Sequence, residues 1–183
     1  MARASVVSQR SATIGALVGY SGVVIALTML KAFYRIGYLW DPANQMRRGL
    51  SLSPFDDLIN ASSWFGPVFE YGGNVAFFAP VGMLAYILFQ RTSRPLLATT
   101  LLGACFSLAI ETSQYIFALG YSDIDDLLMN TLGAFIGAVL AKLFGPKFHW
   151  FWIGLASLAT ITFVGLVIGG ESLGDPSKVK QLS

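Results

Sequence analysis

The chain has 183 residues, of which 55% are hydrophobic and only 12% are charged, and its mean hydropathy is +0.63. Soluble domains carry about 25% charged residues, so this composition argues against a soluble domain and favours an integral membrane protein. The net charge of +2 indicates little about partners, and we expect no nucleic acid among them. The single cysteine, Cys105, excludes an intramolecular disulfide.

Five apolar segments are long enough to cross a membrane, which takes about 20 mostly apolar residues per helix. They are 11–30, 74–89 with its apolar flanks, 96–119, 127–144 and 150–169. Helices are the expected form, because lipid cannot satisfy open backbone groups and the segments lack the alternation of barrel strands. The sequence therefore predicts an all-α, polytopic membrane helix bundle with about five transmembrane helices.

The predicted chain has four parts. Residues 1–10 are expected to form an N-terminal tail and 11–144 a four-helix membrane core that includes an outer loop over 31–73. Residues 150–169 are expected to form a fifth transmembrane helix, and 170–183 a flexible C-terminal tail. The first span is predicted to be a retained anchor, because 11–30 is longer than the roughly 7–15-residue apolar region of a signal peptide.

The distribution of basic residues predicts the orientation. Lys and Arg divide equally between the two sides of the predicted bundle. The short, purely basic connections, 91–94 and the region around 147–149, fall on the same side as the N-terminus, and such loops favour the cytoplasm. We therefore expect a cytoplasmic N-terminus, with the loop 31–73 and the turn 122–126 facing out.

Polar side chains are concentrated in AIETSQYIFALGYSDIDDLLMN (109–130), between two predicted spans. At the 3.6-residue period of a helix, one face of the third span carries Thr100, Gly103, Ser107, Glu111 and Gln114, with Tyr115 at its border. One face of the fourth span carries Asp126, Asn130, Gly133 and Gly137, joined by Asp123 if that helix starts early. We expect these two helices to form a hairpin, with the polar stripe of one facing the small face of the other.

The depth of these residues predicts a pocket in the outer leaflet. Glu111 follows Pro95 by 16 residues, which places it about 24 Å along the helix and near the outer boundary. Asn74 opens the predicted second span on the same side, where a kink at Pro80 would open space in the bundle. The candidate ligand-binding residues are Glu111, Gln114, Asn130, Asn74, Asp123, Asp126 and Tyr115.

Each of these residues also has a structural interpretation. Placing a carboxylate such as Glu111 in a membrane costs about 2.5–3.5 kcal/mol, which favours a function, but a buried acid bonded to Gln114 or Asn130 is the alternative. Polar side chains such as Gln114 also join helices. Ser122 or Asp123 can cap the fourth helix. The Gly133 and Gly137 pair is typical of close helix packing, within one chain or in an oligomer.

A metal or cofactor is not expected. The polar cluster contains no histidine and Cys105 has no partner, which argues against zinc. If a metal were bound, it would be a hard cation held by Asp123, Asp126 and Glu111, because such cations prefer oxygen ligands.

Three blocks of the sequence resemble the VanZ-like family of small bacterial membrane proteins. They are LSLSPFDDLI (50–59), GGNVAFFAPVGMLAYIL (72–88) and ETSQYIFALGYSDIDDLLMNTLGAFIG (111–137), and together they cover about half of the chain. Members often carry an arginine just before the Asp-x-Asp-Asp turn. Here Gly120 or Tyr121 occupies that place, with Arg47 or Arg48 as a candidate substitute.

The resemblance implies a bacterial plasma membrane protein with a role in susceptibility to glycopeptide antibiotics, teicoplanin above all. We favour a non-enzymatic protein whose pocket binds a lipid-linked cell-wall precursor or a lipidated glycopeptide. The alternatives are a metal-dependent membrane enzyme acting on a lipid phosphate and a proton-coupled lipid transporter or flippase driven by Glu111. Metal-dependent turnover or proton-coupled flux would distinguish these alternatives. Membrane lipids are expected partners in every case.

Overall fold

The structure is a computed structural model that describes residues 2–34, 36, 46 and 48–170. Within these residues, five helices are long and apolar enough to cross a membrane, as predicted. They lie within α1 (Ala2–Met29), α3 (Phe65–Phe89), α4 (Pro95–Phe117), α5 (Ile124–Phe144) and the run of η2 (Pro146–Phe148) into α6 (His149–Ile168). The short helix α2 (Asp56–Asn60) and the strands β1 (Arg48–Ser51) and β2 (Gly120–Asp123) complete the described elements.

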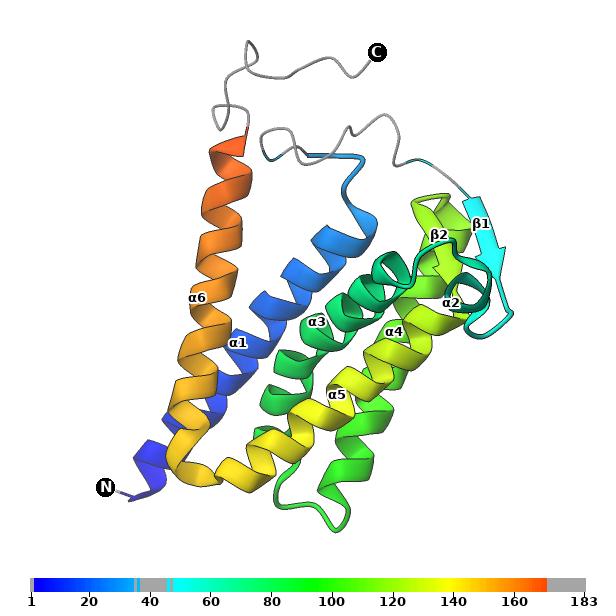
Figure 1. The fold of residues 1–183 in the computed structure, drawn as a ribbon. Coiled ribbons are helices and arrows are strands. Elements are labelled where there is room, and N and C mark those ends of the chain that lie inside the picture. The colour runs from blue at the N-terminus through cyan, green and yellow to red at the C-terminus, as the bar shows by residue number, and fades with distance from the viewer. Residues whose placement is uncertain (1, 35, 37–45, 47, 171–183) are drawn as a thin grey trace.

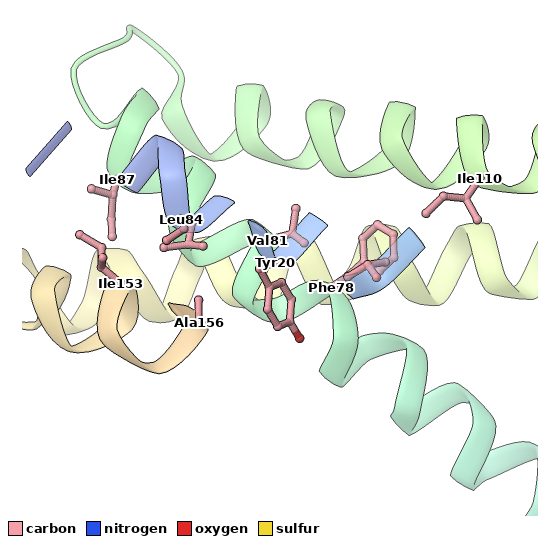
Figure 2. Close-up of a cluster of buried hydrophobic side chains, with 10 residues drawn as sticks. Tyr20, Phe78, Val81, Leu84, Ile87, Ile110, Ile153 and Ala156 are labelled. Carbon is pink, nitrogen blue, oxygen red and sulfur yellow. The ribbon is translucent and has the colours of Figure 1, made fainter. Parts of the chain in front are cut away.

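Helix α3 is the centre of the bundle (Figure 1). It packs most extensively on α5 and also contacts α1, α4 and α6, while α6 packs mainly on α1 at the edge. Figure 2 shows the apolar core that these contacts bury, drawn from α1 (Tyr20), α3 (Phe78 to Ile87), α4 (Ile110) and α6 (Ile153 and Ala156). The central position of α3 explains why its residues 81–87 are buried without a break.

The two ends of the bundle differ in charge. The strands, α2 and the α4–α5 connection lie at one end, which we call the acidic end (Figure 1). The start of α1, the 90–94 turn and the α5–α6 turn lie at the other, which we call the basic end. The acids between residues 48 and 170 lie in α2 and β2 or near those ends of α3, α4 and α5 that adjoin the acidic end; they are Asp56, Asp57, Glu70, Glu111, Asp123, Asp125 and Asp126.

Small residues allow α3 and α5 to approach closely. A Cβ atom on Gly137 would lie 1.9 Å from the carbonyl oxygen of Ala79, and one on Gly133 would lie 2.4 Å from that of Val75. Conversely, a Cβ on Gly82 would lie 2.0 Å from the carbonyl oxygen of Ala134. The predicted partner of the Gly133 and Gly137 face was α4 or a second chain, but α3 occupies it. An oligomer contact through these glycines would have to displace α3.

Two boundaries differ from the predicted ones. Helix α3 begins at Phe65, so the predicted loop 31–73 ends nine residues early and Asn74 lies within the helix. Pro67 is tolerated because the amides of a first helical turn have no intrahelical acceptor. Helix α1 begins at Ala2, which makes the predicted tail over 1–10 helical from its second residue. The predicted C-terminal tail beyond Gly170, and loop residues 35, 37–45 and 47, lie outside the described residues.

The acidic end contains a feature that the helical prediction did not include. Strands β1 and β2 pair in parallel, with Arg48 opposite Gly120 and Ser51 opposite Asp123. This pairing holds the segment before α2 against the α4–α5 connection.

The kink expected at Pro80 is visible in Figure 2 as a change in the direction of α3 beside Phe78.

Candidate binding groove at the acidic end

Glu111 is fixed by the connection that follows its own helix. Its side chain is 5% exposed, in the second-last turn of α4. The backbone N–H of Asp123 donates to its Oε2 atom at 2.8 Å, and the Ser122 hydroxyl also hydrogen bonds to the carboxylate. The predicted partners, Gln114 and Asn130, make other contacts. The carboxylate therefore joins the end of α4 to the start of α5.

A groove of about 230 Å³ opens beside Glu111. Its polar lining comes from Glu111, Thr112, Ser122 and Asp123, and Tyr115 also lines it. The apolar lining comes from β1 and its following residue (Leu50 and Leu52) and from both helices (Leu108, Ile124 and Leu127). The groove thus combines a hydrocarbon surface with two carboxylates, and three of the predicted site residues line it.

Asp123 caps helix α5. Its backbone is extended and its Oδ1 atom accepts the backbone N–H of Asp125 at 2.8 Å, as the capping interpretation predicted. Ser51 on the paired strand also hydrogen bonds to this side chain. Burial raises the pKa of Asp123, and the nearby carboxylates of Asp125 and Asp57 raise it further, while the bond from the Asp125 amide acts in the opposite direction.

Asp125 is a structural anchor that the sequence analysis did not single out. It is 3% exposed, and its two carboxylate oxygens accept the backbone N–H of Phe55 at 3.0 and 2.9 Å. The Tyr71 hydroxyl donates to the same carboxylate at 2.6 Å. Asp125 therefore ties the loop before α2 and the start of α3 to α5. The available signal was a third acid in a turn whose cap needs one or two.

The remaining predicted residues lie away from the groove. Asn74 on α3 donates to the carboxylate of Asp126 on α5. The Nδ2 atom of Asn130 donates to the hydroxyl of Ser107 at 2.9 Å, inside the seam between α5 and α4. This bond confirms the predicted hairpin and matches the structural interpretation of Asn130.

Gln114 points toward α1. Its Nε2 atom donates to the carbonyl oxygen of Thr28 at 3.2 Å, so Gln114 is not the hydrogen-bond partner of Glu111 that the structural interpretation offered. Its Oε1 atom is buried and has no hydrogen-bond partner among the described residues. The polar residues of one sequence stripe thus divide among the groove, the α4–α5 seam and the contact with α1.

Arg48 lies beside the place before the acidic turn where the resemblance leads us to expect an arginine. It pairs opposite Gly120 across the two strands, as one of the two candidate substitutes. Its Nη2 atom donates to the carbonyl oxygen of Ile116 at 3.0 Å, and its guanidinium lies 5.7 Å from the centre of the Tyr115 ring. The side chain therefore covers the end of α4 beside the groove; Arg47 lies outside the described residues.

The geometry gives no support for a metal centre. Over the described parts of the chain, no group of three His, Cys, Asp or Glu side chains is arranged to hold a metal ion. Glu111, Asp123 and Asp126 instead use their oxygens in the contacts described above.

The fold and the groove define a multi-pass helical membrane protein with an amphipathic groove at one end of its bundle. The VanZ/LLP1 family model matches residues 17–145. The chain is also 34% identical over 132 residues to Protein VanZ from Enterococcus faecium, which covers 72% of each chain. The chain therefore belongs to the VanZ/LLP1 family. No solved structure matches it.

Proposed function

We propose that this protein is a non-enzymatic component of the bacterial plasma membrane whose groove binds a lipid-linked cell-wall precursor or a lipidated glycopeptide. Binding would change susceptibility to teicoplanin-type antibiotics. The observation that carries the proposal is the amphipathic groove, in which a leucine-lined surface meets the carboxylates of Glu111 and Asp123. Membership of the VanZ/LLP1 family supports a role of this kind.

The two surfaces of the groove match two parts of an amphiphile. Leu50, Leu52 and Leu108 are each at least half exposed and offer contact to hydrocarbon. The carboxylates accept hydrogen bonds and repel anions, so they favour hydroxyl, amide or ammonium groups. Both candidate ligands carry hydrocarbon and such donors. In this proposal, any phosphate of the ligand lies away from Glu111 and Asp123.

The proposed orientation places the groove where both ligands occur. Arg10, Arg91 and Arg94, with Lys142 and Lys147, belong to the elements of the basic end. Positive residues in short connections favour the cytoplasmic side. With the N-terminus in the cytoplasm, the acidic end and its groove face the outer leaflet.

Glu111→Gln tests this proposal most directly. Glutamine keeps an oxygen that accepts the Asp123 amide but replaces the carboxyl group that the ligand would meet. We expect the wild-type protein to shift teicoplanin susceptibility of a host lacking the gene, and Glu111→Gln to lose most of that shift at matched membrane abundance. Asp56→Asn is the control, because it removes a carboxylate of an exposed residue outside the groove.

Two outcomes would count against the proposal. An unchanged shift in the Glu111→Gln variant would show that the groove carboxylate is structural. If the wild-type protein does not shift teicoplanin susceptibility, this chain has no role in it. The next assays would then measure metal-dependent hydrolysis of a lipid phosphate and proton-coupled lipid flux across vesicles.

A further inference from the structure

A second binding site lies at the basic end of the bundle, remote from the groove at Glu111. A cleft of about 200 Å³ opens between the start of α1 and the end of α3. Its polar lining consists of two guanidinium and two carboxamide side chains, from Arg10, Arg91, Gln9 and Gln90. Four side chains rich in N–H donors are therefore gathered around one small space, which suits an anion with several oxygens.

The positive charge of this cleft is not neutralised by neighbouring acids. The sequence has no Asp or Glu between residues 1 and 40 or between 71 and 110. These ranges contain all of α1 and the end of α3. Both arginine side chains are exposed, so they remain accessible to a ligand. Gln90 is held in place by a hydrogen bond from its Nε2 atom to the carbonyl oxygen of Ile87, at 2.8 Å.

An apolar groove follows the same helices toward the middle of the membrane. Its volume is about 610 Å³, and it lies between α1 and α4 over part of α3. On α1 it is lined by residues from Leu17 to Ile25, on α3 by Val81, and on α4 by Leu102, Cys105 and Phe106. All of these residues lie in membrane-spanning segments, where hydrocarbon is the surrounding solvent.

The cleft and this groove lie on matching helix faces. At 100° per residue, Leu17 and Ser21 fall within about 20° of Arg10 around α1. On α3, Leu88 in the cleft and Val81 in the groove are likewise within about 20° of each other. The groove begins about 10 Å beyond Arg10 along α1 and ends about 22 Å beyond it. A phosphate in the headgroup layer lies roughly 20 Å from the bilayer midplane, so its acyl chain covers this range.

We propose that an anionic phospholipid binds at the basic end, with its phosphate between Arg10 and Arg91 and one acyl chain in the groove between α1 and α4. A basic cleft and an apolar groove that follow one another along the same helix faces favour a phospholipid over free phosphate. The lipid comes from the leaflet at the basic end. It fills the space where α1 and α4 make little direct contact.

Native mass spectrometry of the full chain in detergent tests the phosphate half of this site. Phosphatidylglycerol is added, and phosphatidylcholine with the same chains serves as the comparison. We expect phosphatidylglycerol to bind more tightly, and the double variant Arg10→Gln with Arg91→Gln to weaken its binding by at least about tenfold. The double variant Lys142→Gln with Lys147→Gln is the control, because it makes the same charge change at the same end outside the cleft.

Glycine substitutions test the acyl half. Gly22 lines the groove, and a Cβ atom there would meet nothing within 4 Å, so Gly22→Leu should fill the groove without strain. Gly15→Leu is the matched control, since its Cβ is equally unobstructed and Gly15 does not line the groove. We expect Gly22→Leu, and not Gly15→Leu, to weaken phosphatidylglycerol binding.

Several results would overturn the proposal. One is equal binding by the wild-type protein and the double arginine variant, and another is an equal loss in the lysine control. Equal effects of Gly22→Leu and Gly15→Leu on phosphatidylglycerol binding would show that no acyl chain occupies the groove. Displacement of the lipid by millimolar inorganic phosphate would show an anion site without a lipid preference. Size-exclusion profiles and melting temperatures would identify any variant that fails to fold.

Discussion

The carboxylate of Glu111 accepts the backbone N–H of Asp123 at 2.8 Å, so the acid of α4 holds the residue that caps α5. The side chain of Asp123 then accepts the backbone N–H of Asp125 at 2.8 Å. Asp125 in turn accepts the backbone N–H of Phe55. These contacts form a continuous chain of hydrogen bonds from α4 to the loop before α2. The geometry of the groove therefore depends on side chains that do not line it.

Removing the carboxylate of Asp125 should destabilise the acidic end. Asp125→Ala leaves the hydroxyl of the half-buried Tyr71 and the amide of Phe55 without their acceptor, and we expect a loss of about 3 kcal/mol in the free energy of unfolding. Tyr71→Phe removes one partner only and should cost about 1 kcal/mol. Denaturant unfolding in detergent measures both values.

Asp57→Ala is the control for this prediction, because Asp57 is an exposed acid close to the same loop. This substitution should change the free energy of unfolding by no more than about 0.5 kcal/mol. Equal stabilities of the Asp125→Ala and Asp57→Ala variants would show that the bonds from Phe55 and Tyr71 contribute nothing net.

Adding one methyl group between α3 and α5 should disrupt the bundle. Gly137→Ala places a Cβ 1.9 Å from a backbone oxygen of Ala79, which no side-chain rotation can relieve. We expect a destabilisation of about 3 kcal/mol or more, seen as a lower melting temperature in detergent. Gly154→Ala in α6 is the control, since its added Cβ meets nothing within 4 Å, and it should be neutral or slightly stabilising. Similar melting temperatures for both variants would exclude close packing of α3 on α5.

The bond between Asn130 and Ser107 should contribute to stability and little to binding. A double-mutant cycle with Asn130→Ala and Ser107→Ala should give a coupling energy of about 0.6 kcal/mol, with about 1.7 kcal/mol as the upper range for such bonds in membranes. At matched abundance, Asn130→Ala should keep the susceptibility shift that Glu111→Gln loses. A zero coupling energy, together with loss of the susceptibility shift in Asn130→Ala, would instead indicate that Asn130 binds the ligand.

Asp123 should make stability depend on pH. Because its folded-state pKa is raised above the unfolded value of about 3.9, its contribution is fully present below that value. The contribution is lost as the pH rises through the folded pKa. We expect the wild-type protein to lose stability relative to Asp123→Asn as the pH increases from about 4. Asp56→Asn controls for the change in net charge, and a wild-type curve parallel to that of Asp123→Asn would refute the effect.

The helices were predictable because each is a long apolar segment, and the 3.6-residue period also placed Ser107, Glu111 and Gln114 on a buried face. The start of α3 was not predictable from the sequence, since Pro67, Gly72 and Gly73 are typical of a loop until tertiary packing is known. The four-residue strands carry too few residues for a periodic signal, and their pairing depends on contacts distant in sequence.

The candidate site was predicted in part. Glu111, Asp123 and Tyr115 line one groove as a group, because their helix ends and turn are close in sequence. Periodicity gives a helix face but not the neighbour that the face meets. For this reason Gln114 was placed beside Glu111 although it reaches α1, and Gly137 was placed toward α4 although it meets α3.

The parallel pairing of β1 with β2 also sets an order of assembly. The two strands are separated in the chain by α2, α3 and α4. During synthesis β1 emerges first and has no partner until both α3 and α4 have been made. The ring closure that joins the strands is therefore a late step. A nascent chain that stops before Gly120 can insert its first helices and still lack every groove contact made by Ser122 and Asp123.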